Sequence, residues 1–102
     1  MAFSLTACQV KRPETVIPDA KMENVLYDFH IAKAMGEEVP YSDSYKRVLY
    51  IESVYKKHGI TQADFDSSMV WYARHPDALT KVYEKVNQRL KAERDGINHL
   101  IA

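Results

Sequence analysis

The stretch that decides the fold is TQADFDSSMVWYARHPDALTKVYEKVNQRL, residues 61–90. Apolar side chains recur at helical spacing on both sides of His75-Pro76, and no segment alternates polar and apolar residues as a strand does. The first four residues, TQAD, resemble a capping box with aspartate in place of glutamate, so a helix begins there. Pro76 suits the first turn of the next helix, where a missing N–H breaks no intrahelical bond. We therefore predict helices over residues 61–74 and 77–94.

The first half of the chain shows the same period. Residues 19–35 form a predicted helix that starts after Pro18 and stops at Gly36. Residues 42–58 form a second predicted helix, with Gly59 in the position where glycine commonly ends a helix. The sequence is therefore helical on both sides of its middle.

Each predicted helix carries an apolar stripe, and the connections are short, which favours antiparallel neighbours. Gly96 is expected to end the last helix, and the apolar tail of residues 97–102 could fold back on the bundle. The sequence predicts an all-α fold, a small bundle of four helices, three long and one shorter. The predicted core residues are Met22, Val25, Leu26, Phe29, Ala32, Tyr45, Val48, Leu49, Ile51, Tyr55, Phe65, Met69, Tyr72, Leu79, Val82, Tyr83, Val86 and Leu90.

Length and charge narrow the functional classes. A chain of 102 residues points to one domain. The 14 basic and 14 acidic residues cancel, which argues against a nucleic-acid partner, because phosphate binding needs a basic excess or stripe. No apolar run approaches the roughly 20 residues that span a bilayer. The single cysteine cannot form an internal disulfide.

That cysteine ends the sequence LTAC, residues 5–8, which reads as a bacterial lipobox. Its small residues suit a signal peptidase that cuts before Cys8, whose thiol would carry a diacylglyceryl group. The apolar stretch and basic start that export needs are missing, so we expect the printed chain to be trimmed or its true start to lie upstream. We predict a signal-peptide remnant over residues 1–8, a polar tether over 9–18 and a helical domain over 19–102. The alternative is a buried core cysteine.

Asp64, Ser68 and His75 are the residue types of a hydrolytic triad. Ser68 and His75 are seven positions apart, about 10 Å along a helix axis, whereas a nucleophile and its base need to be about 3 Å apart. We therefore predict no catalytic residues, and an accessory hydrolytic or metal-binding role for this region remains the alternative. The four histidines form no HxH or HxxxH pair, so neither a metal site nor a cofactor is predicted.

Two further features could mark a binding surface. Glu52 falls inside the apolar stripe of its helix, so it is either paired across the bundle or part of a small-ligand pocket near Trp71. Aromatic and apolar side chains away from the main stripes could dock a protein, or could simply lie at the boundary of the bundle. The candidate interaction or pocket residues are Tyr27, Ile31, Met35, Tyr41, Tyr50, Glu52, His58, Asp66, Trp71 and His75.

Two stretches, VIPDAKMENVLYDFHIAKAM and SVYKKHGITQADFDSSMVWYARHPDALTKVYEKVNQRL, resemble a domain-of-unknown-function family of small lipoproteins from Bacteroidetes. The resemblance covers residues 16–94, and KHGIT, FDSS and the WY that precedes His75-Pro76 are its most specific parts. It implies an all-helical domain tethered through a lipidated cysteine, which matches Cys8. It implies no activity, cofactor or catalytic residue.

These observations favour an uncharacterised lipoprotein of the Gram-negative cell envelope, anchored on the periplasmic side or the cell surface. Its expected partners are the membrane, through the lipid on Cys8, and an envelope protein that docks on an apolar helix face. We expect it to act by binding and not by catalysis. A small-ligand carrier is the remaining alternative. The sequence gives no oligomeric state.

Overall fold

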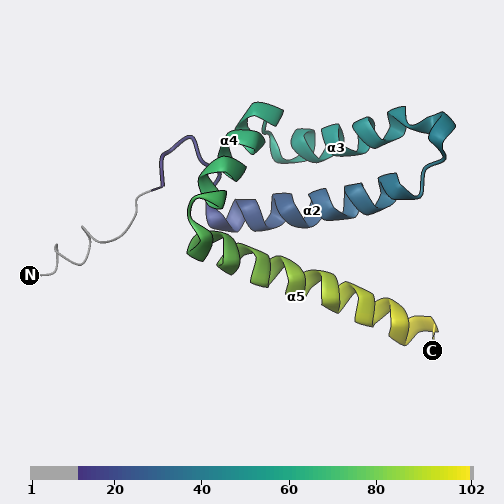
Figure 1. Cartoon of the computed structure of the whole chain (residues 1–102). Coiled ribbons are helices and arrows are strands. Elements are labelled where there is room, and N and C mark those ends of the chain that lie inside the picture. Colours follow the sequence, from purple (N-terminus) through teal and green to yellow (C-terminus); the bar gives the residue numbers. More distant parts are fainter. Residues whose placement is uncertain (1–11, 102) are drawn as a thin grey trace, which may run out of the picture.

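The computed structural model describes the backbone of residues 12–101 and the side chains of residues 12–96. The helices are α2 (Asp19–Glu37), α3 (Tyr45–His58), α4 (Gln62–Ala73) and α5 (Pro76–Ile101), and a 3-10 turn, η1 (Tyr41–Asp43), precedes α3 (Figure 1). The described residues contain no strand. Over residues 12–101, the predicted all-α fold with four helices is confirmed.

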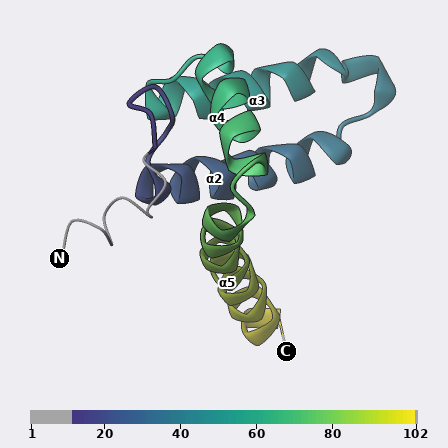
Figure 2. The ribbon, with the colours of Figure 1, turned by 60° about the vertical axis from the view of Figure 1, so that its left-hand side comes forward.

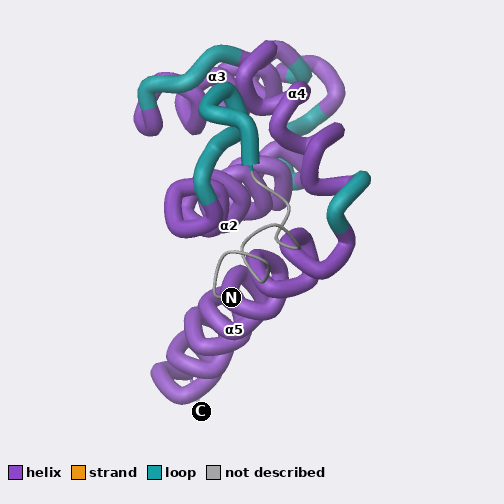
Figure 3. The backbone as a smooth tube through the Cα atoms, turned by 90° about the vertical axis from the view of Figure 1, so that its left-hand side faces the viewer, coloured by secondary structure: helices purple, strands orange, loops and turns teal. Residues whose placement is uncertain are grey.

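The first two helices, α2 and α3, lie side by side as an antiparallel hairpin (Figure 1). The short helix α4 leads from the far end of α3 back toward α2, and α5 then crosses α2 and runs away from the hairpin (Figure 2). Helix α2 is therefore the central element, because it contacts both α3 and α5. Viewed along the hairpin, α5 leaves the other helices as a separate arm (Figure 3).

Local signals set the helix ends near α4. The Thr61 hydroxyl accepts the Asp64 N–H at 3.0 Å and the Asp64 carboxylate accepts the Thr61 N–H at 2.9 Å, so the predicted capping box forms with aspartate in the glutamate position. Gly59 adopts φ 65°, a left-handed conformation that side chains disfavour, and ends α3. Pro76 is the first residue of α5, as predicted.

The core lies where α2 meets the other helices. Met22, Val25 and Leu26 of α2 are at most 1% exposed. The Phe29 and Phe65 rings stack with centroids 5.0 Å apart, which joins α2 to α4. Burial of this kind contributes roughly 1.5–3 kcal/mol per large side chain, so the start of α2 organises the domain.

The buried face of α3 is rotated from the predicted one, because Ile51 and Tyr55 pack against the core as predicted whereas the other three residues of the predicted stripe do not. Tyr45, Val48 and Leu49 are 60%, 58% and 52% exposed, whereas Val54 is buried. The rotation of α3 is set by polar contacts at its two ends: Arg47 Nε donates to the Gly36 carbonyl at 2.7 Å, and His58 Nε2 donates to Asp28 at 2.7 Å. Both contacts require the other side of α3 to face α2.

Two glycines were predicted to end helices: α2 ends at Glu37, one residue past Gly36, whereas α5 continues past Gly96. Gly96 lies inside α5, which continues to Ile101, so the prediction that the tail leaves the helix there and could fold back was wrong. A glycine inside a helix costs about 1 kcal/mol relative to alanine, and α5 continues despite it. Gly36 lies inside α2 and is buried, and a Cβ there would be 3.1 Å from Arg47 Cγ. Its role is to let α3 approach.

Residues 12–18, here called the strap, run across the start of α2 and contact α4. Val16 and Ile17 are each 6% exposed and belong to the hydrophobic core. The folded domain therefore begins before Asp19, where the sequence analysis placed its start, because two apolar residues inside the polar segment are buried.

Candidate functional site

The strap is attached to α4 by two hydrogen bonds at Ile17. The Ile17 N–H donates to Ser68 Oγ at 3.0 Å. The Tyr72 hydroxyl lies 2.7 Å from both the Ile17 carbonyl oxygen and Asp19 Oδ1, so its one proton serves two acceptors. Ser68 and Tyr72 are fully buried. Both backbone polar groups of a buried residue are thus satisfied by side chains of one helix.

Charged and aromatic groups surround this attachment. Arg12 pairs with Asp19, and its guanidinium carbon lies 5.6 Å from the Trp71 ring centroid and 6.0 Å from that of Tyr72. Burial, together with the hydrogen bond to Asp19 and the negative charge there, raises the pKa of the Tyr72 hydroxyl above its usual range. Tyr72 therefore stays protonated and remains a donor.

Trp71 also stacks on His75, with ring centroids 3.9 Å apart. His75 Nδ1 lies 2.7 Å from the Trp71 carbonyl oxygen, which can only accept, so Nδ1 carries the proton. This bond links two consecutive turns at the end of α4. The predicted site residues Trp71 and His75 are thus brought together, beside the strap.

Asp64, Ser68 and His75, the residues of the hydrolytic alternative, each make a separate structural contact. Ser68 Oγ accepts from Ile17, the Asp64 carboxylate caps α4, and the His75 ring bonds to the Trp71 carbonyl. Asp66 is exposed on α4. Among the residues that the structure describes, no group of three His, Cys, Asp or Glu side chains is placed to hold a metal ion. The arrangement positions the strap and does not assemble a nucleophile with its base.

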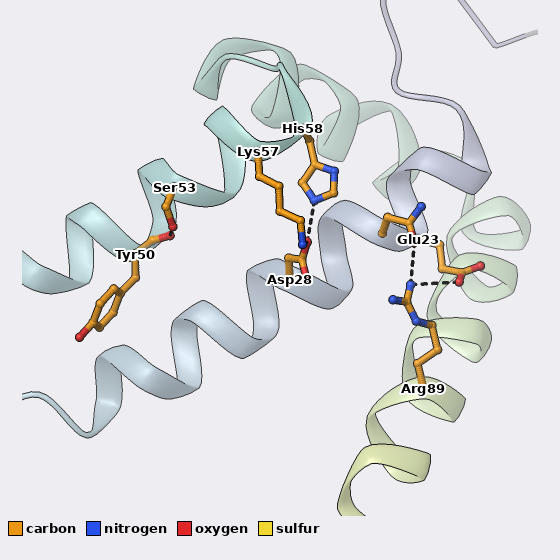
Figure 4. Close-up of polar contacts among 8 residues, drawn as sticks. Glu23, Asp28, Tyr50, Ser53, Lys57, His58 and Arg89 are labelled. Carbon is orange, nitrogen blue, oxygen red and sulfur yellow. Dashed lines mark hydrogen bonds and ion pairs between the residues drawn. The ribbon is translucent and has the colours of Figure 1, made fainter.

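His58, another predicted site residue, lies between α2 and α3 (Figure 4). Its Nε2 donates to Asp28 Oδ2 at 2.7 Å, and Lys57 Nζ lies 2.9 Å from the same oxygen. Partial burial alone would raise the pKa of Asp28, but the bonds and charges of Lys57 and His58 outweigh it and lower that pKa. Asp28, Lys57 and His58, here called the clamp, join α2 to α3.

The predicted docking patch on α2 consists of Tyr27, Ile31 and Met35, of which Tyr27 contacts α5. Arg89 of α5 lies 4.0 Å above the Tyr27 ring and bonds to Asn24 at 2.8 Å and to Glu23 at 3.2 Å (Figure 4). The Tyr27 hydroxyl donates to Glu93 at 3.1 Å. Tyr27 is thus partly covered by α5.

The other two members of that patch are open. Ile31 and Met35 remain 37% and 50% exposed. The predicted patch is therefore reduced to Ile31 and Met35.

Glu52 is exposed, because the stripe that contains it faces outward. It borders an open depression of about 400 Å³ with Val48, Ile51 and Gln62. Trp71 contacts Arg12 and His75 and does not line this depression. The two residues proposed for one ligand pocket are therefore in different places.

Arg12, Ile17 and Asp28 make contacts that were not predicted from the sequence. A signal for the strap was present, since the apolar pair Val16-Ile17 stands between Pro13 and Pro18 in an otherwise polar segment. An exposed linker has no reason to carry such a pair. Asp28 gave no signal, because its partners lie 29 and 30 positions away in sequence, at Lys57 and His58.

None of the helices that the structure describes is both long enough and apolar enough to cross a membrane. No curated protein and no solved structure matches the chain. The model of one family, Domain of unknown function (DUF4296), matches residues 13–96, a span that begins inside the strap and ends in α5. The chain belongs to that family.

Proposed function

We propose that this protein is a lipid-anchored adaptor of the Gram-negative cell envelope, which is held at a membrane through Cys8 and acts by binding another envelope protein. The anchor rests on the lipobox sequence LTAC at residues 5–8. The binding role rests on the structural contacts that Asp64, Ser68 and His75, the residues of the hydrolytic alternative, already make.

The attachment of the strap is the observation that carries the proposal. Ile17 is hydrogen-bonded to Ser68 and Tyr72 only nine positions after Cys8. A flexible linker needs no such attachment, whereas a chain that transmits force or orientation from an anchor does. Three residues separate Cys8 from Arg12, so the anchor and the start of the strap are at most about 14 Å apart. The domain would thus lie close to the bilayer surface.

Six of the seven large apolar side chains that are exposed among the described residues lie away from this attachment, and the seventh is Val70 of α4. The strap is at one end of the molecule and the turn between α2 and α3 is at the other (Figure 1). Ile31, Met35, Tyr45, Val48 and Leu49 belong to the helical parts that approach this turn. An anchor at one end and apolar surface toward the other fit an adaptor that presents its docking surface away from the membrane.

The decisive experiment is the intact mass of the N-terminal peptide of the native protein purified from its own membranes. The expected result is a mature chain that starts at Cys8 and carries a diacylglyceryl group and an acyl chain. A Cys8→Ser variant of the full precursor should leave the membrane fraction, while a Ser4→Ala variant should stay. A free Cys8 thiol inside an uncut chain would overturn the proposal.

A further inference from the structure

The outward side of α3 carries an apolar stripe that no other described element covers. Tyr45, Val48, Leu49, Glu52 and Lys56 recur at helical spacing, and all of them are exposed; we call them the α3 stripe. The side of α3 that faces α2 contains Arg47, Val54 and His58 instead. The two sides are roughly opposite on the helix, so the stripe points away from the bundle.

The polar groups of the stripe are arranged for self-recognition. Glu52 and Tyr45 stand at equal distances on the two sides of the Val48–Leu49 pair. If a second copy of α3 packs antiparallel with a two-fold axis at that pair, each Tyr45 lies opposite Glu52 of the other copy. A tyrosine hydroxyl donates and a carboxylate accepts, so the contact has two identical hydrogen bonds.

The charges at the ends of α3 also match in this arrangement. Lys56 of one copy lies opposite Tyr41 in the η1 turn of the other, two residues from Asp43, whose carboxylate also lies 3.5 Å from Lys46 Nζ of its own chain. Two antiparallel helices place their dipoles in opposite directions, which is favourable at close range. The depression bordered by Val48 and Glu52 gives the large side chains of the second copy a place to enter.

We propose that the α3 stripe is a dimer interface, in which α3 packs antiparallel on α3 of a second copy of this chain. The helix from Tyr45 to Lys56 offers a contact roughly 17 Å long, which makes a small interface. Anchoring two copies in one membrane raises their effective concentration, so a weak contact suffices in place. The proposal goes beyond the adaptor function, since it assigns α3 to a second copy and leaves Ile31 and Met35 of α2 to the other envelope protein, and it does not depend on lipidation.

The first test is disulfide trapping in the full chain with Cys8→Ser, which removes the only native thiol. Leu49→Cys places a thiol beside the proposed axis, and Val70→Cys is the matched control, because Val70 is 51% exposed on α4 and Leu49 is 52% exposed. Under oxidation the Leu49→Cys chain should form a covalent dimer at least tenfold faster than the Val70→Cys chain. Equal rates would overturn the proposal.

The register is tested by mixing two chains, one with Tyr45→Cys and one with Glu52→Cys. The antiparallel arrangement predicts that the mixed disulfide forms faster than either homodimer. A parallel contact would favour the homodimers and contradict the proposed geometry.

Sedimentation equilibrium of the Cys8→Ser chain gives an independent readout. We expect a concentration-dependent dimer that Leu49→Glu converts to a monomer without loss of helical circular dichroism. A chain that stays monomeric at millimolar concentration, or a dimer that Leu49→Glu leaves intact, would overturn the proposal.

Discussion

The two ends of this molecule are built in opposite ways. At the strap end, Val16 and Ile17 are buried, and Ser68 and Tyr72 satisfy the backbone of Ile17. At the hairpin end, defined as residues 38–49, Tyr45, Val48 and Leu49 are more than half exposed. At the strap end, buried apolar and polar groups hold the chain in place. At the hairpin end, apolar side chains are exposed to solvent.

This difference separates the residues that stabilise the fold from those that are exposed and available to a binding partner. Residues that hold the fold should tolerate substitution poorly, since their partners are already desolvated. Residues that are offered to a partner should tolerate substitution well in the isolated protein and poorly in a complex. Matched substitutions at the two ends test whether this difference holds.

The largest expected effect comes from truncating a core leucine. Leu26→Ala, at a position 1% exposed, should lower the free energy of unfolding by about 2–5 kcal/mol, because it removes buried methyl groups and leaves a cavity. Leu49→Ala, at the hairpin end, should change it by less than about 0.5 kcal/mol. Urea unfolding followed by circular dichroism measures both. Similar losses in the two variants would mean that the α3 stripe is part of the core.

A smaller effect tests the strap. Ser68→Ala leaves the buried Ile17 N–H without its acceptor and should cost about 1–3 kcal/mol. The neighbouring Ser67→Ala is the control, because Ser67 is exposed and its hydroxyl bonds only to the Asp64 carbonyl, so it should change stability by less than about 0.5 kcal/mol. Hydrogen exchange of the Ile17 amide should accelerate only in Ser68→Ala. If both variants behave alike, the strap is not held by Ser68.

The sequence predicted the elements better than their rotation. The capping box at Thr61 and the left-handed Gly59 form as expected, because both depend on residues within one turn. The face of α3 was predicted only in part: Ile51 and Tyr55 pack against the core, whereas Tyr45, Val48 and Leu49 are exposed, because an apolar stripe does not show which of its edges is buried. The actual rotation depends on Arg47 reaching the Gly36 carbonyl, a contact across 11 positions.

The same limit applies to the candidate site. Trp71 and His75 were identified and lie together, since they are neighbours on one helix. The role of Ser68 depends on Ile17, 51 positions earlier, and a local pattern shows no such pairing. Ser68 was therefore considered as a nucleophile, whereas it accepts a hydrogen bond from the strap.

The smallest expected effect is on the pH dependence of stability, and it comes from the clamp of Asp28, Lys57 and His58. Asp28 has a folded-state pKa below its unfolded value of about 3.9, so its contribution to stability is present above pH 4 and is lost as the pH falls further through the folded pKa. Asp28→Asn should lower stability at pH 7 by about 0.5–1 kcal/mol, because the bonds to Lys57 and His58 lose their charge. The stability of Asp28→Asn should also fall less than that of the wild type when the pH drops below 4. The exposed Asp66→Asn variant is the control, and its stability should fall as much as that of the wild type. Thermal melts at pH 7, 4 and 3 make the comparison. An Asp28→Asn profile parallel to that of the wild type would show that the clamp contributes no charge-dependent stability, and the rotation of α3 would then depend on Arg47 alone.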